Sequence, residues 1–554
     1  MGNVTEVVRP IPGSDSPPLV VDSRERIEES YGDYLSDESR YGPAEADRLI
    51  IVRDEAQVSD ALVSAADAGV NVTVSAGRTG IVGGAVPAGG VLLSLAGMKG
   101  VLGIRRLPDG RFTVRVEPGL SVAELRERLL TKDLGVDGGE QGPAARADLE
   151  AFLADDRTFF YPPDPTEDTA HLGATVATNA SGARSYRYGA TRRHVHGLRV
   201  VLTTGGVVAV ERGRCLADGR LFLLEGSDGS QVEVRVPGYA MPDTKNAAGY
   251  YAAENMDLID LLIGSEGTLG VITEVELFLA PSPEGILSAL AFFGSDEDAV
   301  EFVKHARGDA LAKSEPGVVD PIALEFFDSR SFEFLRRRKA EEGPSSEIPE
   351  LPDGAAAGVL FETEFTEDTL FEIYEGWESV LSEHGSSMEN TWGGMEESEL
   401  ARLRALRHSI AEQVNGVIAR ANARYPVIHK IGTDAAVPPG ALEEMFGFYR
   451  GELDGTPLEH VIFGHIGDNH LHLNIMPSSP EELRDGKELA TRFARRAVEL
   501  GGTVSAEHGI GRIKHDFLRL QYGNDGMRQM ADVKRAFDPS CVLNRGVVFP
   551  EELL

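Results

Sequence analysis

Apolar side chains follow two different spacings near the start of the chain. Residues 49–52 are continuously apolar and predict a buried strand, and residues 70–75 predict a second one. Between them, apolar positions recur at intervals of three and four. This spacing predicts an amphipathic helix over residues 55–68 with a buried stripe of Val58, Ala61, Leu62 and Ala65. Residues 1–45 are polar, rich in proline and without either spacing, so we expect an N-terminal arm rather than a domain.

The strand and helix pattern continues to about residue 280 and then changes. Before that point the predicted elements are strands at 92–95 and 113–116, a helix at 122–130 and a hairpin at 197–210, with insertions at 138–156 and 212–255. Beyond it, longer strands and helices alternate, which favours an α+β domain with an antiparallel sheet. The elements predicted there are strands at 287–293 and 358–365, helices at 296–306, 369–383, 397–422 and 527–537, and a loop at 343–357.

The predicted helix at 397–422 carries a charged residue where its apolar stripe is expected to continue. Arg407 occupies the slot between Leu403 and Ile410 in a stripe made of Leu400, Leu403, Ile410, Val414 and Val417. A guanidinium in such a slot needs a carboxylate or phosphate partner. That partner is either a bound anion or an acidic side chain of the protein, unless the arginine extends to the surface. The spacing leaves these alternatives open.

Length and composition narrow the class of protein. A chain of 554 residues predicts two or three domains, and a net charge of −35 argues against nucleic acid or an anionic membrane as the main partner. The two cysteines, Cys215 and Cys541, are too few for a disulfide framework or an iron–sulfur cluster. The sequence shows neither a long apolar run nor a signal-peptide pattern, so we expect a cytoplasmic protein without a transmembrane segment.

Candidate chemistry concentrates in two short segments, 465–474 and 505–511. The first contains His465, His470 and His472, three of the 13 histidines, and the second contains Glu507 and His508. In a strand, His470, His472 and Asn474 would share one face, while Leu471, Leu473 and Ile475 would face a core. Imidazole and carboxylate are the ligands that Zn²⁺ prefers, so the segments predict a metal or catalytic site. A purely structural histidine cluster is the alternative.

Two other segments are unusually rich in small residues. Residues 75–85 contain glycines at a density that lets backbone N–H groups approach a phosphate closely. They fit neither the Rossmann nor the Walker pattern. Residues 173–183 are almost free of large side chains, which suits a ligand lying flat on the backbone. A glycine-rich turn and a tightly packed helix are the respective alternatives.

Taken in order, these segments resemble the FAD-dependent D-2-hydroxy-acid dehydrogenases, which include D-lactate, glycolate and D-2-hydroxyglutarate dehydrogenases of the vanillyl-alcohol-oxidase flavoprotein superfamily. The resemblance also rests on Pro-Asp-Pro at 163–165, on Gly-Ser-Glu-Gly-Thr-Leu-Gly at 264–270 and on Asp-Pro at 538–539, followed by Leu543 and Asn544. The chain departs from the family pattern at Arg78, Asn469, His470, Arg545 and Val547. His470 stands where the family has asparagine, so it could compete as a ligand.

The resemblance implies an α+β fold with an FAD-binding domain at 46–280, an antiparallel-sheet substrate or cap domain at 281–512 and a C-terminal segment at 513–554 that returns to the FAD domain. It implies a non-covalent FAD at the junction of the two domains. The residues that it assigns to the flavin are Ala76, Gly77, Arg78, Thr79, Gly80, Gly83, Gly84, Pro163, Asp164, Gly173, Ala174, Thr175, Thr178, Asn179, Gly182, Ala183, Tyr188, Glu266, Gly270, Ile272 and Asn544.

The resemblance also implies the remaining roles. His465, His472 and Glu507 correspond to ligands of a divalent metal such as zinc, and His508 to the catalytic base; Arg407, Lys430 and Asn474 correspond to substrate contacts. The implied reaction oxidises a D-2-hydroxy acid to the 2-oxo acid. Electrons would pass to an external acceptor, either an electron-transfer flavoprotein, a quinone or an iron–sulfur subunit. A homodimer is left open.

Two alternatives from other functional classes remain at this point. A flavin-free zinc hydrolase would explain the histidine and glutamate cluster but not the glycine-rich segments. A flavin-domain subunit of a larger redox complex, without substrate turnover of its own, would explain those segments but not an intact Glu507-His508 pair.

Overall fold

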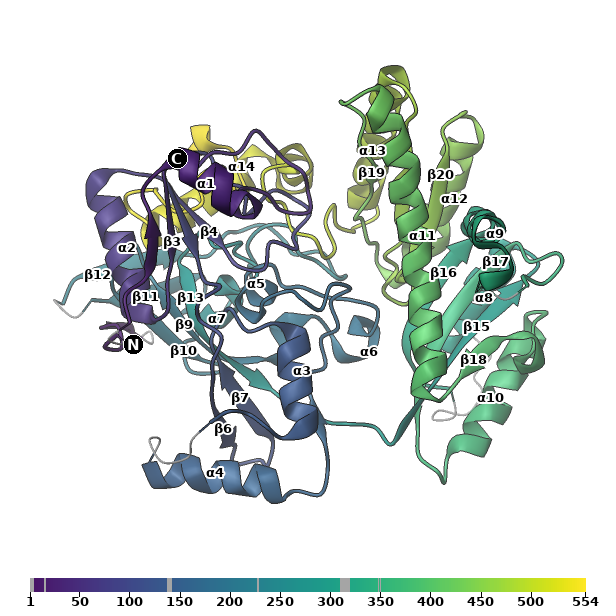
Figure 1. Ribbon diagram of the computed structural model, residues 1–554, viewed down its shortest axis with the longest axis horizontal. Helices are drawn as coiled ribbons and strands as arrows, with labels where there is room; N and C mark the ends of the chain where they lie inside the picture. Colours follow the sequence, from purple (N-terminus) through teal and green to yellow (C-terminus); the bar gives the residue numbers. More distant parts are fainter. Residues whose placement is uncertain are drawn as a thin grey trace.

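The computed structural model describes residues 4–13, 16–136, 142–226, 229–308, 319–346, 348 and 350–554. Figure 1 shows two lobes: the early and late parts of the chain form one, and the middle of the chain forms the other. The predicted insertion at 138–156 and the predicted loop at 343–357 lie partly outside the described residues. Within the described part, no helix combines the length and apolar character needed to cross a membrane.

A four-stranded sheet in the order β2-β3-β5-β4 begins the first lobe, with β3 and β4 parallel to the central β5. Its strands are Leu19–Val21, Arg48–Ile51, Val91–Ser94 and Val72–Ser75 in that order. Ile27 of helix α1 (Arg24–Tyr31) shares a buried cluster with residues of β2, β3 and β5, and α2 spans the predicted Glu55–Ala68. Helix α2 begins at Asp54, whose carboxylate accepts a hydrogen bond from Gln57 N, and ends at Gly69 in the left-handed region.

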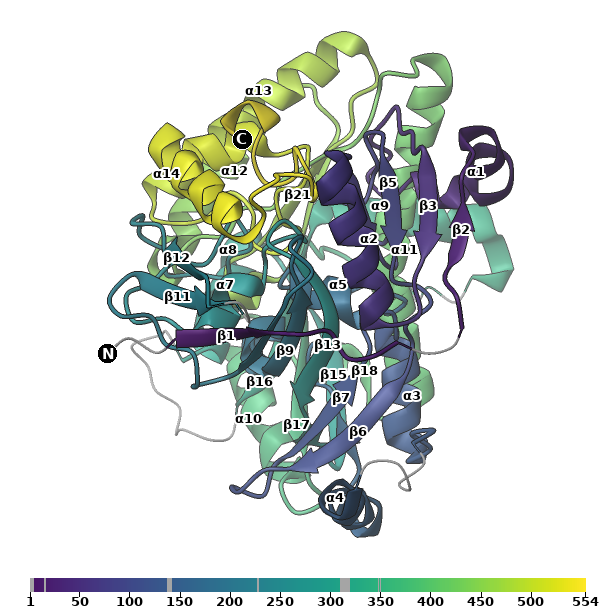
Figure 2. The ribbon, with the colours of Figure 1, turned by 90° about the vertical axis from the view of Figure 1, so that its left-hand side faces the viewer.

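An eight-stranded sheet completes this lobe in the order β12-β11-β1-β10-β9-β13-β7-β6. The strands are Gln231–Arg235, Leu221–Glu225, Val4–Val8, Val207–Glu211, Val195–Val201, Val271–Phe278, Phe112–Val116 and Val101–Arg106. Helix α2 packs between the two sheets, as Figure 2 shows, and its Val58 and Leu62 share a buried cluster with strands of both. The lobe's other helices are α3 (Val122–Thr131), α4 (Gly142–Ala154), α5 (Leu172–Ala177), α6 (Ser185–Tyr188) and α7 (Leu258–Leu262).

The prediction of an N-terminal arm was wrong for β1. This strand lies inside the eight-stranded sheet, antiparallel to β10 and parallel to β11. Its five residues include three valines, which suit a pleated and half-buried surface, but the polar composition of residues 1–45 as a whole concealed them. The strand joins β11 and β12, which belong to the predicted insertion at 212–255, to the rest of the sheet.

The second lobe is built on a seven-stranded sheet in the order β18-β15-β17-β16-β20-β21-β19. The strands are Trp392–Gly394, Gly285–Phe293, Ala357–Phe365, Pro321–Asp328, His460–Gly464, His472–Ile475 and Ile431–Gly432. All described pairings are antiparallel, as predicted. Alternate side chains of β15 enter two different cores, Ala289 and Ala291 on one face and Leu290 and Phe292 on the other.

Helices cover both faces of this sheet. One core includes side chains of α8 (Asp296–Ala306), α10 (Leu370–Glu383), α12 (Leu442–Asp454) and α13 (Pro480–Glu499). The other includes side chains of α9 (Ser329–Glu342) and α11 (Glu397–Arg424). The idea that Arg407 interrupts the stripe of α11 was wrong, because Leu406 continues the stripe between Leu403 and Ile410 and Arg407 lies beside it.

The C-terminal helix α14 (His515–Phe537) brings the chain back to the first lobe. It is longer than the predicted 527–537 and is interrupted at Gly523, whose φ is 66°. Near its end the ammonium of Lys534 is buried and donates to Asp538 Oδ2 at 2.9 Å and to the carbonyls of Thr268 and Leu543. Asp538 also accepts a hydrogen bond from Thr203. These contacts join the helix to the turn that follows α7 and to the last segment of the chain.

We expect Lys534→Met to destabilise the protein by about 3–5 kcal/mol, because it leaves a buried carboxylate without its cation. The measurement is the free energy of unfolding of the FAD-loaded protein in urea. Arg528→Met is a matched control on the same helix, since Arg528 is largely exposed and its pair with Asp525 is worth about 0.5 kcal/mol or less. Similar losses in both variants would contradict the structural role given to Lys534.

Candidate active site

The histidine segment lies between two neighbouring strands of the second lobe. Strand β20 ends at Gly464, and His465 follows directly before a short 3-10 turn at Ile466–Asp468. Asn469 then has a φ of 54°, in the left-handed region where the family has glycine. Strand β21 begins at His472, so His470 precedes it. Leu471, Leu473 and Ile475 are buried in the core as predicted.

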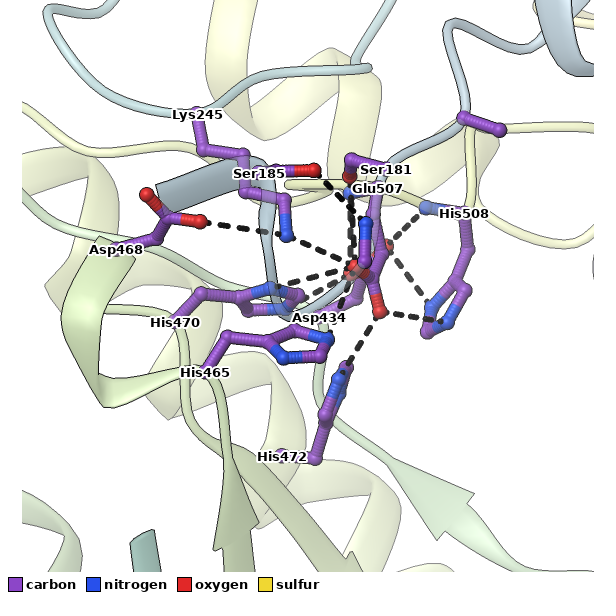
Figure 3. A network of polar contacts seen from close by, with 12 residues as sticks. Ser181, Ser185, Lys245, Asp434, His465, Asp468, His470, His472, Glu507 and His508 are labelled. Carbon is purple, nitrogen blue, oxygen red and sulfur yellow. Dashed lines mark hydrogen bonds and ion pairs between the residues drawn. The ribbon is translucent and has the colours of Figure 1, made fainter. Parts of the chain in front are cut away.

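Glu507 comes from the loop between α13 and α14 and lies against these histidines (Figure 3). Its Oε1 is 3.0 Å from His472 Nε2, and its Oε2 is 3.3 Å from His465 Nε2. Oε2 is also 3.9 Å from His470 Nδ1. One donor atom from each of the four residues lies within 4.8 Å of the others. The structure thus brings the three predicted ligands together and adds His470.

The chemistry of this donor set fits a divalent ion of the zinc type, which favours nitrogen and oxygen ligands. Burial lowers the pKa of His470 to about 3, which keeps its imidazole neutral and available as a ligand. Neither ring nitrogen of His470 makes a well-formed hydrogen bond to another described residue, although Nε2 lies 3.0 Å from Asp434 Oδ1. Burial would raise the pKa of Glu507, but Lys245 and His465 outweigh it and hold that pKa well below its usual value. The carboxylate is therefore charged.

His508 faces the same carboxylate from the other side and is oriented by Asp434. His508 Nδ1 lies 3.2 Å from Asp434 Oδ2, and His508 Nε2 lies 3.3 Å from Glu507 Oε1. Burial alone would lower the pKa of His508, but the charge of Asp434 and its hydrogen bond outweigh burial and raise that pKa. Asp434 is itself held by Lys514 Nζ and Ser505 Oγ, each at 2.6 Å. A histidine paired with a buried acid in this way is suited to act as a general base.

A second buried acid, Glu325 on β16, connects a histidine of the site to Arg407. Its Oε1 accepts a short hydrogen bond from His465 Nδ1, and its Oε2 lies 3.0 Å from Arg407 Nε. Burial would raise the pKa of Glu325, but Arg407 and His465 outweigh it and lower that pKa to about 2. Burial would also lower the pKa of His465, yet Glu325 and Glu507 raise it to about 9. Arg407 therefore has a protein carboxylate as one partner.

Sequence reasoning missed Glu325 and gave Asp434 no role. A signal for Glu325 was present, because it is the one charged residue in the apolar run from Ile322 to Phe327. Asp434 lies four residues after Lys430, which the resemblance assigns to the substrate. Lys430 itself is exposed at the start of β19, and Asn474 is buried opposite Gly432 on the neighbouring β21.

The three segments predicted to hold FAD converge in the first lobe. Glu266 N donates to Ala177 O at 2.8 Å and Gly264 N to Val176 O at 3.0 Å. These bonds join the segment at 264–270, the third along the chain, to the second, at 173–183. A Cβ at Gly77 would lie 3.1 Å from His171 N, so the first segment also touches the second. Arg78 has a φ of 61° where the family has glycine, and its guanidinium lies 4.4 Å from the ring of Tyr34.

Several small residues of these segments are required by the protein itself. A Cβ at Gly182 would lie 1.9 Å from Asp164 O, and one at Gly173 would lie 2.4 Å from Pro118 Cβ. A Cβ at Gly270 would lie 2.5 Å from Val200 Cγ1. The tight-packing alternative therefore explains these three glycines without a ligand. It does not explain Gly80, where a Cβ would meet nothing within 4 Å. Gly83 in the same loop has a φ of 75°, and a Cβ there would lie 3.1 Å from Tyr41 Cβ.

The side chains of Glu266 and Asn544, predicted to contact the flavin, bind the protein backbone. The Glu266 carboxylate accepts hydrogen bonds from Ile510 N and Gly511 N, each at 2.8 Å, and burial raises its pKa to about 7. Asn544 accepts from Val74 N at 2.8 Å and donates to Glu266 O at 2.9 Å. The third flavin segment is thereby tied to the loop that carries Glu507 and His508.

Other predicted flavin residues are also engaged with the protein. The hydroxyls of Thr175 and Thr178 donate to carbonyls of their own helix, and Asn179 accepts from Arg192 N at 2.9 Å. Asp164 accepts from Arg184 N, and Tyr188 donates a short hydrogen bond to Glu364 of the second lobe. Ile272 pairs with Val200 in the sheet. Pro163, Ala174 and Ala183 lie in the same segments.

Comparison with known proteins identifies both lobes. Residues 46–145 and 136–211 match the family described as FAD binding domain, and residues 282–548 match the family described as FAD linked oxidases, C-terminal domain. The chain is 29% identical over 521 residues to a D-lactate dehydrogenase of Anaerostipes hadrus, covering 93% of this chain and 92% of that protein. It is 26% identical over 514 residues to glycolate oxidase subunit GlcD of Bacillus subtilis, covering 91% of this chain and 89% of that protein.

A solved structure of alkyldihydroxyacetonephosphate synthase shares the fold. It superposes with a TM-score of 0.59 over 98% of this chain and 88% of that one, at 15% sequence identity. The predicted α+β fold with its two domains is thus confirmed. With an FAD binding domain in one lobe and an oxidase C-terminal domain in the other, the chain belongs to the FAD-linked oxidases and is an FAD-dependent oxidoreductase.

Proposed function

We propose that this protein oxidises a D-2-hydroxy acid of the lactate, glycolate or 2-hydroxyglutarate type to the 2-oxo acid. The observation that carries the proposal is the position of the His508–Asp434 pair, which faces a cluster of three histidines and Glu507 beside the flavin segments. The names of the related D-lactate dehydrogenase and glycolate oxidase subunit support the substrate class. The match to an FAD binding domain argues against the flavin-free hydrolase.

The substrate end of the site is built to hold an anion next to a hydroxyl. His465, His470, His472 and Glu507 would hold a divalent ion, which polarises the substrate hydroxyl and carboxylate when bound. Glu325 lies against Nε of Arg407, and the terminal nitrogens of the guanidinium are proposed to bind a substrate carboxylate. Lys430, directly before β19, and Asn474 on β21 are proposed as further substrate contacts.

The proton of the substrate hydroxyl is taken by His508. Asp434 holds Nδ1 of the ring, so the nitrogen proposed to accept the proton is Nε2, which lies 3.3 Å from Glu507 Oε1. A bound FAD would supply the acceptor for the hydride of C2. The residues proposed for FAD are the 21 that the resemblance assigns to it, Asn544 included. Among them, the loop at 76–84 offers backbone N–H groups to a pyrophosphate. Two cysteines cannot hold a cluster, so the electrons leave to an external flavoprotein, quinone or iron–sulfur subunit.

Anaerobic addition of D-lactate or glycolate is expected to bleach the flavin absorption of the purified protein. In His508→Gln the reduction rate is expected to fall by about 10²–10⁴, because the base is lost while FAD stays bound. His429→Gln, which changes an exposed histidine of the same lobe, is the matched control and should reduce at the wild-type rate. A flavin that no 2-hydroxy acid reduces would contradict the proposal and favour a subunit without its own turnover.

Arg407→Lys is expected to lower kcat/KM roughly 30- to 1000-fold, which corresponds to a loss of about 2–4 kcal/mol of transition-state stabilisation. The reason is that the lysine ammonium cannot make the two parallel hydrogen bonds that a planar guanidinium makes to a desolvated carboxylate. FAD and metal content should not change. Arg404→Lys, an exposed position on the same helix, controls for effects on α11. If Arg407 only pairs with Glu325, the variant will have a lower melting temperature and nearly unchanged kcat/KM per folded molecule.

The pH dependence of kcat/KM should report the His508–Asp434 pair. His508 must be neutral to accept a proton, and its pKa is raised by Asp434, so kcat/KM should rise with pH through a midpoint above the usual histidine pKa of about 6.5. Asp434→Asn removes the charge that raises this pKa, so the rise should move to lower pH. Steady-state assays across pH on both proteins, with FAD content as the folding control, test this; an unmoved midpoint would exclude His508 as the titrating base.

A further inference from the structure

The metal-ligand cluster already contains a buried cation from the first lobe. Lys245 lies in the connection between β12 and α7, and its side chain is 7% exposed. The backbone beside it is fixed, because Ala247 N donates to Ser505 O at 2.9 Å and Thr244 donates to Val437 O at 3.2 Å. Figure 3 shows the ammonium between Asp468 and Glu507.

Lys245 binds the Glu507 oxygen that also faces His465 and His470. Its Nζ lies 2.9 Å from Glu507 Oε2, the same oxygen that lies 3.3 Å from His465 Nε2. An ion bound by His465 and Glu507 would therefore lie close to the ammonium. Two like charges that contact the same oxygen repel strongly where water is excluded. An ion could therefore not bind Glu507 Oε2 while the ammonium stays where it is.

A second carboxylate is in place to receive the displaced ammonium. Asp468 Oδ2 lies 3.7 Å from Lys245 Nζ. This oxygen is buried and accepts no hydrogen bond from any other described residue. An unsatisfied buried acceptor is costly, so a movement of Lys245 toward Asp468 would satisfy it. The distance is within reach of a change in the side-chain rotamer alone.

We propose that Lys245 competes with the divalent ion for Glu507 and transfers to Asp468 when the ion binds. This inference rests on the proposed metal-assisted function. In the metal-free protein the ammonium neutralises Glu507 and links the two lobes. In the metal-bound protein the Lys245–Asp468 pair keeps that link, while Glu507 becomes a ligand. The lysine thus sets how tightly the ion is held.

The test measures Zn²⁺ affinity in FAD-loaded protein that has been stripped of divalent ions, by competition with a chromogenic chelator. Lys245→Met should bind Zn²⁺ at least about tenfold more tightly, because the competing charge is gone. Asp468→Asn should bind it about tenfold less tightly, because the ammonium loses its alternative partner. The double variant should bind as Lys245→Met does, since the two changes act through one side chain.

Two controls separate competition from other effects. Lys514→Met removes a nearby cation that binds Asp434 instead of Glu507, and it should change Zn²⁺ affinity much less than Lys245→Met. FAD content and melting temperature show whether each variant folds. If Lys245→Met does not fold, Asp468→Asn still tests the competition for Glu507, because it keeps the lysine. His472→Ala should abolish the binding and so locate it at this cluster.

The outcomes distinguish this inference from the function on which it rests. Unchanged or weaker binding by Lys245→Met, or equal tightening by Lys514→Met, overturns the competition while the metal site stands. If the wild type binds no Zn²⁺ but Lys245→Met does, the lysine replaces the ion altogether, which overturns both the transfer to Asp468 and the metal-assisted function. If neither protein binds Zn²⁺, both the inference and the metal-assisted function fail.

Discussion

The burial of the Glu507 carboxylate is the constraint on which the site depends. A charged group taken out of water needs cations or donors around it, and here they come from both lobes. Lys245 and Ser181 approach Oε2 from the first lobe, while His465 and His472 approach from the second. The junction between the lobes is therefore fixed by electrostatics at the place where a substrate and a flavin would meet.

Most of the fold could be predicted from apolar spacing. Helix α2 was predicted with its observed bounds, and so was α8, because each has an apolar stripe and a capping residue directly before it. Strand β1 could not be predicted, because five residues without a turn signal give no local indication of a partner more than 200 residues away. The true stripe of α11 was also missed: Leu406 and Arg407 are adjacent, and the spacing of three or four residues permits either.

Site residues that lie close together in the sequence could be predicted, and those that distant segments contribute could not. His465, His472, Glu507 and His508 lie in two such segments, and the structure brings them together. Glu325, Asp434 and Lys245 come from three other segments, so only the fold reveals that they hold the ligands and the base. The flavin residues could be predicted as segments, but Gly173 and Gly182 show that a small side chain is also demanded by neighbouring backbone or side-chain atoms of the protein.

The pairing of Asn544 with Val74 has a consequence for how the chain is made. These residues are 470 positions apart, and Asn544 N also donates to Val72 O, so the last segment completes the sheet that the first segments begin. During synthesis, β4 leaves the ribosome long before its partner exists. The lobe that begins the chain can therefore complete this pairing only after residue 544 has been synthesised. Contacts of such high sequence separation raise the contact order of the fold, which is associated with slow folding.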